Sequence, residues 1–586
     1  MKDVLSRSYH SDPQVFRVNE LADHAYFIPF ASKDQTKKSR ENSPYFHSLC
    51  GDWQFLWRPS LYDMEDFTAD GFPLSGFDTV TVPECWQAHG KDYTQYQSSP
   101  YPFLNDPPHV PQKNPCAAYV KDFDISIEQG KRYELHFEGK DSCIYVWMNG
   151  QFVGYGEVPH NDSAFDVTNY LKEGRNRLCV LVLKWCTGTY LDDQDKIRLS
   201  GLFREVYLLK RAEKGVTDFT LLANAKGELT LSVKAKAPVS AQIYDKDRLL
   251  AECSVDGTWH WKVDEPVLWS AECPHLYDLI LCCEGEYIRH RFGFRDSTAE
   301  NGVYKVNGHP VKLYGVNRHD SHPDKGYVTD LEFMRQELML MKQHNVNAIR
   351  TSHYPNDPRF YQLCDEFGFY VLSEADLEYH GMYYVEDKDY FSERPEWAGA
   401  LHDRIDRMYQ TFKNQTCIVI WSLGNESHVG DDIEAMNAFF KEKKDGRLVH
   451  YEGVCQDRSY EDTVSDVESR MYAPPAQIRE YLENNPKKPF ILCEYMHDMG
   501  NSIGGMGSYI KLLDEFEMYQ GGFIWDFIDQ AILVTDAVTG RKVMRYGGDF
   551  DDRPSDYEFS GNGIVFADRS EKPAMQEVRY YYGLYK

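Results

Sequence analysis

Two short apolar segments of the chain each run directly into a glutamate. Residues 417–428, CIVIWSLGNESH, suit a buried strand that ends on Asn425 and Glu426, and residues 489–497, PFILCEYMH, carry a second apolar run that ends on Glu494. In a parallel barrel the carboxyl ends of all strands face one rim, so the two carboxylates would share a pocket. A strand-end glutamate can also begin a loop or cap a helix, but two in the same context favour a catalytic pair.

Polar or aromatic side chains follow the other candidate strands as well. These strand-end residues are Asn317, Arg318, His319, Arg350, His353, Glu378, His380, Tyr472, His497, Trp525 and Asp526. Two carboxylates among such groups suit a ring with many hydroxyls, and the matching reaction is glycoside hydrolysis. Retention of configuration needs carboxyl groups about 5 to 5.5 Å apart and inversion about 6.5 to 9.5 Å, a distance that the sequence does not give.

Two further clusters of polar residues have more than one interpretation. Glu378 and His380 stand two residues apart in LEYHG, so they would point to one side of an extended backbone. With a third acid they would hold a divalent cation, and the alternative is a structural role. Residues 187–204 include three aspartates, which form either a solvated acidic turn or, through Asp195 or a neighbour, a ligand for a cation or a sugar hydroxyl.

The elements that must position these groups fall into three parts. Short strands with turn signals predict a jelly-roll-like, sugar-binding-like β-sandwich over residues 1–215, and strands without helical periodicity predict an immunoglobulin-like β-sandwich over residues 216–297. Over residues 298–586, eight strand candidates alternate with helices. This pattern is typical of a (β/α)8 TIM barrel, which would be the catalytic domain.

Local sequence signals predict where several strands and helices begin or end. Asn149-Gly150 predicts a type I′ hairpin, and Thr329 with Glu332 predicts a capping box at the start of a helix. Asp357 followed by proline predicts another helix start, with Gly368 at its end. Residues 101–115 contain too many prolines for ladder strands and predict an extended loop.

Composition narrows the classes of partner. The formal net charge is −28, which argues against nucleic acid or an anionic membrane as a partner. The N-terminal residues contain no apolar run of signal-peptide length and no segment suits a membrane span, so we expect a cytoplasmic protein. The fourteen cysteines lack CxxC pairs and are expected to be reduced core thiols.

Seven motifs, in order along the chain, closely resemble those of glycoside hydrolase family 2, specifically its large multidomain β-galactosidases. They are NRHDSHP, IRTSHYPN, EADLEYHGM, IWSLGNES, ILCEYMHDMGNS, GGFIWDFIDQ and SGNGIVFADR. The resemblance runs from about residue 45 to the C-terminus. It implies a retaining mechanism with Glu494 as nucleophile and Glu426 as acid/base.

The resemblance also implies roles for cations and for further side chains. A Mg²⁺ ion would be held by Glu378, His380 and Glu426. A Na⁺ ion near the galactose 6-hydroxyl would be held by Asp195, the backbone carbonyl of Phe559 and Asn562. The implied substrate contacts are Asn105, Asp195, His319, Arg350, His353, Asn425, Tyr472, His497, Trp525 and Asn562, with Arg350 close to the nucleophile.

The expected activity is hydrolysis of terminal β-galactosides such as lactose through a covalent galactosyl-enzyme, with transgalactosylation as a side reaction. The alternatives are a β-glucuronidase or β-mannosidase of the same family, or a folded fragment that is inactive without a C-terminal partner. Long family members continue into further β-domains, whereas this sequence ends at Lys586. We therefore expect a truncated form or the large subunit of a split enzyme, with a homo-oligomer or a C-terminal-domain subunit as the assembly.

Overall fold

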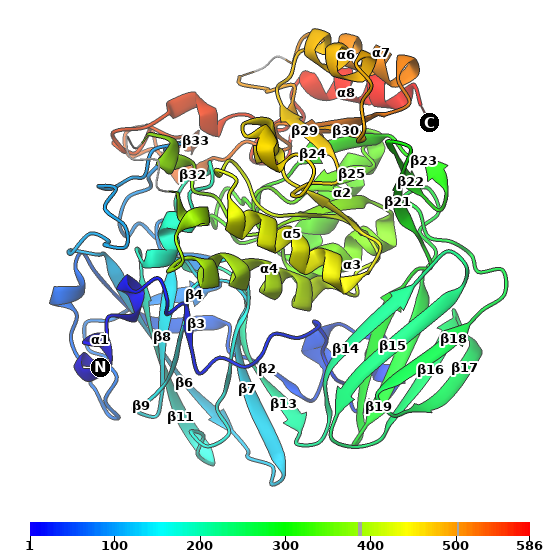
Figure 1. Ribbon diagram of the computed structural model, residues 1–586. Helices are drawn as coiled ribbons and strands as arrows, with labels where there is room; N and C mark the ends of the chain where they lie inside the picture. Colours follow the sequence, from blue (N-terminus) through cyan, green and yellow to red (C-terminus); the bar gives the residue numbers. More distant parts are fainter. Residues whose placement is uncertain (385–389, 501–502, 586) are drawn as a thin grey trace.

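A computed structural model describes residues 1–384, 390–500 and 503–585 of the chain (Figure 1). Asn501 and Ser502, the last two residues of the motif that contains Glu494, lie outside the described residues. Two β-rich parts lie beneath and beside a part in which strands and helices alternate (Figure 1).

The N-terminal part is a β-sandwich whose larger sheet is buried on both faces. Val180 packs into one hydrophobic core and its neighbour Leu181 into another, because successive side chains of a strand point to opposite faces. The larger sheet has the order β1 (Arg17–Val18), β9 (Gln151–Gly156), β8 (Cys143–Met148), β11 (Gly174–Leu183), β6 (Cys116–Ile125), β3 (Gly51–Arg58), β4 (Asp78–Val82). The smaller sheet has the order β10 (Ser163–Asp166), β7 (Lys131–Phe137), β13 (Val206–Ala212), β2 (Phe46–Ser48).

The predicted hairpin and the predicted proline-rich loop are both confirmed. Asn149 and Gly150 join β8 to β9 with φ angles of 52° and 81°, the left-handed backbone that a type I′ turn requires. Residues 101–115 contain no strand or helix. A short pair, β5 (Glu84–Cys85) with β12 (Gly201–Leu202), lies at the edge of the sandwich that meets the barrel.

The second part consists of two small antiparallel sheets around one core. One has the order β14 (Val216–Ala223), β15 (Glu228–Ala235), β18 (Thr258–Lys262), and the other β17 (Arg248–Val255), β16 (Val239–Asp245), β19 (Tyr277–Cys283), β20 (Glu286–Phe292). Leu231 and Leu279 are fully buried between the sheets. A three-stranded connection leads on to the barrel through β21 (Ser297–Glu300), β22 (Val303–Val306) and β23 (His309–Pro310).

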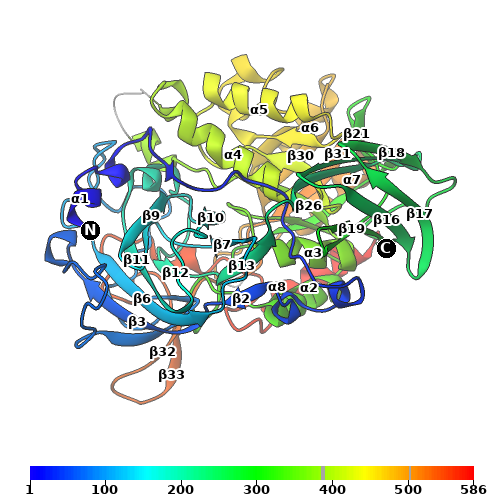
Figure 2. The same ribbon diagram turned by 90° about the horizontal axis from the view of Figure 1, so that it is seen from below.

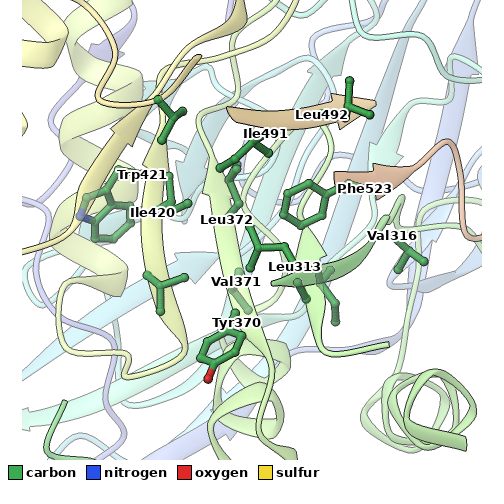
Figure 3. Close-up of a cluster of buried hydrophobic side chains, with 14 of the residues drawn as sticks. Leu313, Val316, Tyr370, Val371, Leu372, Ile420, Trp421, Ile491, Leu492 and Phe523 are labelled. Atoms are coloured by element: carbon green, nitrogen blue, oxygen red, sulfur yellow. The ribbon is translucent and has the colours of Figure 1, made fainter. Parts of the chain in front are cut away.

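The third part is an eight-stranded parallel barrel, as predicted. Its strands follow the order β28 (Leu448–His450), β27 (Ile418–Ser422), β26 (Tyr370–Glu374), β25 (Ala348–Arg350), β24 (Leu313–Asn317), β31 (Tyr519–Ile524), β30 (Phe490–Tyr495), β29 (Glu468–Met471). Each strand overlaps one of the eight strand candidates, which are residues 311–319, 347–355, 369–381, 417–428, 448–453, 467–473, 490–495 and 521–527. Hydrophobic side chains of these strands, Leu372 and Phe523 among them, pack into one cluster (Figure 3).

Helices surround this barrel and keep the strands parallel. They are α2 (Leu331–Gln343), α3 (Pro358–Phe367), α4 (Ala398–Phe412), α5 (Asp431–Lys443), α6 (Pro475–Glu483), α7 (Met506–Glu515) and α8 (Ala574–Gly583), and a short helix, α1 (Lys2–Leu5), lies at the N-terminus. The stripe Trp397, Leu401, Ile405, Met408 and Phe412 is buried along α4, as its spacing predicts. A hairpin, β32 (Ile532–Thr535) with β33 (Lys542–Arg545), projects from the barrel (Figure 2).

One helix start is predicted correctly and another is wrong by one residue. Asp357 caps α3 and Gly368 ends it in the left-handed conformation, as expected. At α2 the cap is Asp330 rather than Thr329, because a carboxylate oxygen of Asp330 accepts the Phe333 N–H at 2.8 Å. The hydroxyl of Thr329 instead donates to Asp320.

All fourteen cysteines fall within the described residues, and all are free thiols. Most of them are buried, as the prediction of reduced core thiols requires. Across residues 1–384, 390–500 and 503–585, no helix reaches the length and apolarity that crossing a bilayer would need.

Candidate active site

The two glutamates lie at the carboxyl ends of two strands of the same parallel barrel. Glu426 follows β27 and Glu494 lies within β30. The Glu426 side chain is 28% exposed and that of Glu494 is 5% exposed. Burial raises the pKa of Glu494 to about 7 against the opposing effect of Arg350, and the charge of Glu426 adds to the rise. The two carboxyl groups therefore influence one another and titrate as a coupled pair.

Arg350 connects the buried carboxylate to its neighbours. One guanidinium nitrogen donates to Oε1 of Glu494 at 2.8 Å, and another donates to Oδ1 of Asn425 at 2.7 Å. The same side chain makes a two-bond contact with Glu374, at 2.7 and 3.0 Å. Because Arg350 is fully buried and always charged, it favours the ionised form of Glu494.

Tyr472 and His497 lie on the other side of Glu494. The Tyr472 hydroxyl donates to Oε2 of Glu494 at 2.6 Å, so both carboxylate oxygens have a donor. The His497 ring contacts the ring of Tyr472 edge-on, with centroids 5.5 Å apart, and also contacts Phe559. Glu494 is thus held in one orientation by Arg350 and Tyr472, which come from the ends of two different strands, β25 and β29.

His319, His353 and Trp525 form an aromatic wall beside Glu494. His353 stacks on Trp525 with centroids 5.1 Å apart, and its Nε2 lies 3.8 Å from Oε1 of Glu494. His319 meets Trp525 edge-on, and its Nε2 has no hydrogen-bond partner among the described residues. Burial lowers the pKa of both histidines well below the usual value, so both rings are neutral. An aromatic surface beside one unpartnered ring nitrogen, Nε2 of His319, suits a sugar, which has both apolar faces and hydroxyl groups.

Glu378, His380 and Glu426 meet at a candidate metal site. One ligand atom from each lies within 4.8 Å of the others, and Nδ1 of His380 is 2.8 Å from Oε2 of Glu426. Burial and the nearby Glu426 raise the pKa of Glu378 well above its usual value, and Oε1 of Glu378 accepts no hydrogen bond from the described residues. Burial also acts to raise the pKa of Glu426, but contact with His380 outweighs it and the net shift is downward. Two crowded carboxylates with an imidazole nitrogen fit a divalent cation.

A loop of the N-terminal sandwich pairs with the segment that carries these candidate ligands. The Glu378 N–H donates to the carbonyl of Leu191 at 2.8 Å, and the Asp193 N–H donates to the carbonyl of Glu378 at 3.1 Å. A carboxylate oxygen of Asp193 also accepts the N–H of Gly381 at 2.7 Å. The backbone on both sides of His380 is therefore held by residues from the first part of the chain.

The residues expected to hold Na⁺ lie at the same end of the barrel. Asp195 accepts a hydrogen bond from Tyr96 at 2.6 Å, and burial raises the pKa of Asp195 to about 7. The side-chain amide of Asn562 donates to the carbonyl of Phe559 at 2.5 Å, while its Oδ1 is buried without a partner in the described part of the chain. The Asn562 carbonyl accepts the N–H of Asp526, next to Trp525. A carboxylate and carbonyl oxygens are donors that a hard cation accepts.

Asn105 reaches the barrel from the proline-rich loop. Its side-chain nitrogen contacts the sulfur of Met382 at 3.5 Å, and its Oδ1 is buried and has no hydrogen-bond partner among the described residues. Met382 follows His380 by two residues, so Asn105 lies beside the candidate metal segment.

Arg318, a strand-end residue that we expected to line the pocket, does not. Its guanidinium binds Glu337 at 2.6 Å, together with Asp320 and Asn356, in a fully buried network. The preceding Asn317 does face the site, where its Oδ1 accepts a hydrogen bond from Arg350 at 3.1 Å. Successive side chains of an extended strand point to opposite sides, so only one of the two can line the pocket.

Two buried carboxylates in the site, Glu374 and Glu452, were not predicted from the sequence as site residues. Glu374 ends β26 and binds Arg350 as well as Nδ1 of His353, the latter at 2.7 Å. Glu452 follows β28, and one of its oxygens accepts the backbone N–H of Glu426 at 2.8 Å. Both follow the strand-end rule that identifies Glu426 and Glu494, so the same signal, applied to every strand, finds them.

This architecture defines the class of protein. A parallel (β/α)8 barrel that places two glutamates at the carboxyl ends of its strands, within a wall of aromatic and polar groups, is a framework for glycoside hydrolysis.

The comparisons with known proteins then define the family. Models of glycosyl hydrolases family 2 match residues 46–212 as the sugar binding domain, residues 204–295, and residues 298–586 as the TIM barrel domain. A β-galactosidase large subunit of Lactobacillus acidophilus is 42% identical to this chain. The alignment covers 98% of this chain and 99% of that protein. One of Leuconostoc lactis is 41% identical over the same shares. The chain belongs to glycoside hydrolase family 2.

Other relatives differ in length or in activity. A β-galactosidase of Priestia megaterium is 39% identical over 98% of this chain, which spans 60% of that protein. Among solved structures, the β-glucuronidase of an uncultured Clostridium species superposes with a TM-score of 0.73 at 20% identity, over 92% of this chain and 98% of its own. At that identity the likeness shows the shared fold alone.

Proposed function

We propose that the chain is a retaining β-galactosidase that removes terminal non-reducing β-D-galactosyl groups from substrates such as lactose. The observation that carries this proposal is the pair Glu426 and Glu494, with Arg350 and Tyr472 donating to Glu494. Relatives about 40% identical over nearly the whole chain are named β-galactosidases, which supports galactose as the sugar.

The residues divide the reaction into two steps. Ionised Glu494 attacks the anomeric carbon while Glu426 gives its proton to the leaving oxygen. Glu426 then takes a proton from water while the water oxygen attacks the anomeric carbon, and the bond from that carbon to Glu494 breaks. A sugar hydroxyl in place of water gives transgalactosylation. The reaction needs the proton on Glu426 and not on Glu494. The pKa shifts described above favour the reverse, so substrate binding must move the proton within the coupled pair.

A β-glucuronidase is the second candidate, since solved structures of that activity share the fold. Nitrophenyl β-galactoside and nitrophenyl β-glucuronide separate the two. We expect kcat/KM for the galactoside to be at least about 100-fold higher, because a site built for a neutral hydroxymethyl group leaves a carboxylate without a partner. A preference for the glucuronide would reject galactose as the sugar.

Glu378, His380 and Glu426 are the residues that would hold Mg²⁺, and Asp195, Asn562 and the carbonyl of Phe559 would hold Na⁺. The bound Mg²⁺ would supply positive charge beside the acid/base, which adjusts its proton affinity. The protein's own contribution is to hold the segment that contains Glu378 and His380 in place through the sandwich loop.

Removal of Mg²⁺ should lower stability as well as activity. After chelation, adding Mg²⁺ at 100 times its Kd should stabilise the folded chain by about 2.7 kcal/mol, seen as a rise in Tm. The variant His380→Ala should lose this response, while His309→Ala, an exposed histidine in β23, should keep it. An equal Mg²⁺-dependent rise in Tm for wild type and His380→Ala would reject this set of ligands.

We further propose that the protein is cytoplasmic. We also propose that it works in a complex with a second subunit or as a homo-oligomer. Free cysteines throughout fit a reducing compartment. Relatives of matching length are named large subunits, and longer relatives carry extra sequence, which supports a second subunit as the partner. Equal lactose kinetics with and without an added C-terminal polypeptide would argue against such a partner.

A further inference from the structure

The turn that carries Glu426 has an unusual backbone. Glu426 itself has φ +33°, a left-handed conformation that residues other than glycine adopt at an energetic cost, and Gly424 precedes it at φ +146°. A strained residue keeps its conformation only when its surroundings hold it there. The direction of the Glu426 carboxyl therefore depends on the contacts of this turn.

Contacts from the end of β28 hold the turn. One carboxylate oxygen of Glu452 accepts the backbone N–H of Glu426 at 2.8 Å. The preceding residue, Tyr451, donates its hydroxyl to the carbonyl of Ser427 at 2.5 Å. The hydroxyl of Ser427 in turn accepts the N–H of Tyr379 at 2.9 Å and donates to the carbonyl of Asn425.

Glu452 stands out among these contacts because it is a carboxyl group in a buried position. It is 2% exposed, and Oε2 has no hydrogen-bond partner among the described residues. Burying a carboxyl group is unfavourable, so its presence is not explained by packing, which an apolar side chain of similar size would provide. Its hydrogen bond is to the backbone of the residue that must deliver a proton.

We propose that Glu452 is a positioning residue for the acid/base. Its carboxyl group fixes the amide of Glu426 and so directs the Glu426 carboxyl toward the leaving-group oxygen. This inference rests on the proposed function, because it assigns Glu452 a part in the same reaction. Glu452 itself transfers no proton and forms no bond to the substrate.

The leaving group of the substrate separates positioning of the acid from general structural support. Phenolate leaves poorly and needs a proton from Glu426, whereas 2,4-dinitrophenolate leaves without one. Since kcat/KM reports the steps up to departure of the leaving group, loss of acid catalysis should appear with phenyl β-galactoside and not with dinitrophenyl β-galactoside. A variant that merely loosens the barrel should affect both substrates alike.

The test compares Glu452→Ala and Glu452→Gln with wild type. With the phenyl substrate, kcat/KM of Glu452→Ala should fall about ten- to a hundredfold, and with the dinitrophenyl substrate it should stay within about threefold. Glu452→Gln keeps an oxygen acceptor and should recover most of the loss. Glu452→Met, which fills the space without an acceptor, should behave like the alanine variant and replaces it if alanine prevents folding.

Two controls separate this inference from the proposed function. Glu468, at the start of β29, is buried to a similar degree, so Glu468→Ala should lower Tm without any selectivity between the two substrates. Glu426→Ala should show the full selectivity, about 10²- to 10⁴-fold. If Glu426→Ala lacks it, the proposed function fails. A second outcome is that Glu426→Ala shows the selectivity while Glu452→Ala lowers kcat/KM equally for both substrates or leaves kcat/KM unchanged for both. In that case only the role of Glu452 is rejected.

Discussion

Replacing Glu494 with glutamine should lower the turnover of nitrophenyl β-galactoside by about 10⁴- to 10⁶-fold. The amide is close in shape to the carboxyl group, so Arg350 and Tyr472 remain in place, but it cannot attack the anomeric carbon. The loss should fall on kcat and on kcat/KM together, because the bond to Glu494 forms only along the reaction. Steady-state kinetics of the purified full chain measure it.

Covalent labelling identifies the same residue independently of rate. A 2-deoxy-2-fluoro-galactoside with a reactive leaving group slows release of the bound sugar, so the peptide that contains Glu494 should gain the mass of the fluorosugar. Glu494→Gln should remain unlabelled. Glu517→Gln replaces an exposed carboxylate, so this variant should have the activity of wild type and should still be labelled at Glu494. A label on any other residue would contradict the assignment of the nucleophile.

Replacing Arg350 with methionine should destabilise the chain by about 3 to 5 kcal/mol. The substitution leaves Glu374 and Glu494 buried without their shared cation and removes a donor to Asn425. Activity should fall by at least about 10²-fold, because Glu494 loses the charge that favours its ionised form. Chemical denaturation gives the change in stability, and kinetics well below the new Tm give the change in rate.

A double variant separates these two effects. Arg350→Met combined with Glu374→Leu removes both partners of the buried ion pair, so much of the lost stability should return. Activity should not return, since Glu494 still lacks the positive charge and the hydrogen bond of Arg350. Recovery of activity along with stability would mean that Arg350 acts only through folding.

The sequence was sufficient for the barrel because its signals are local. Each strand is a short apolar run that ends in a polar residue, and the cap at Asp357 depends only on its neighbours in the chain. The α2 start was misplaced because Thr329 and Asp330 are both good caps, and the choice depends on Asp320, a residue outside the helix, which engages Thr329. Tertiary contacts decide between two adequate local signals.

Within the site, the residue pattern predicts which side chains lie at the carboxyl ends of the strands, but not the direction in which each one points. Asn317 and Arg318 both end a strand, yet one faces Arg350 and the other faces Glu337. Glu374 carries the same strand-end signal as Glu494, but its role is visible only from its bonds to Arg350. The pairing of residues 191–193 with Glu378 is made largely through the backbone, so no residue pattern marks it.

That pairing has a consequence for the order of events during synthesis. The ribosome delivers the N-terminal residues first, and domains generally fold as they emerge. The loop with Asp193 is therefore made before Glu378 and His380, and these two reach their final geometry only by docking onto it. Because this loop holds the backbone around His380, catalytic turnover reports that the N-terminal sandwich and the barrel are correctly joined.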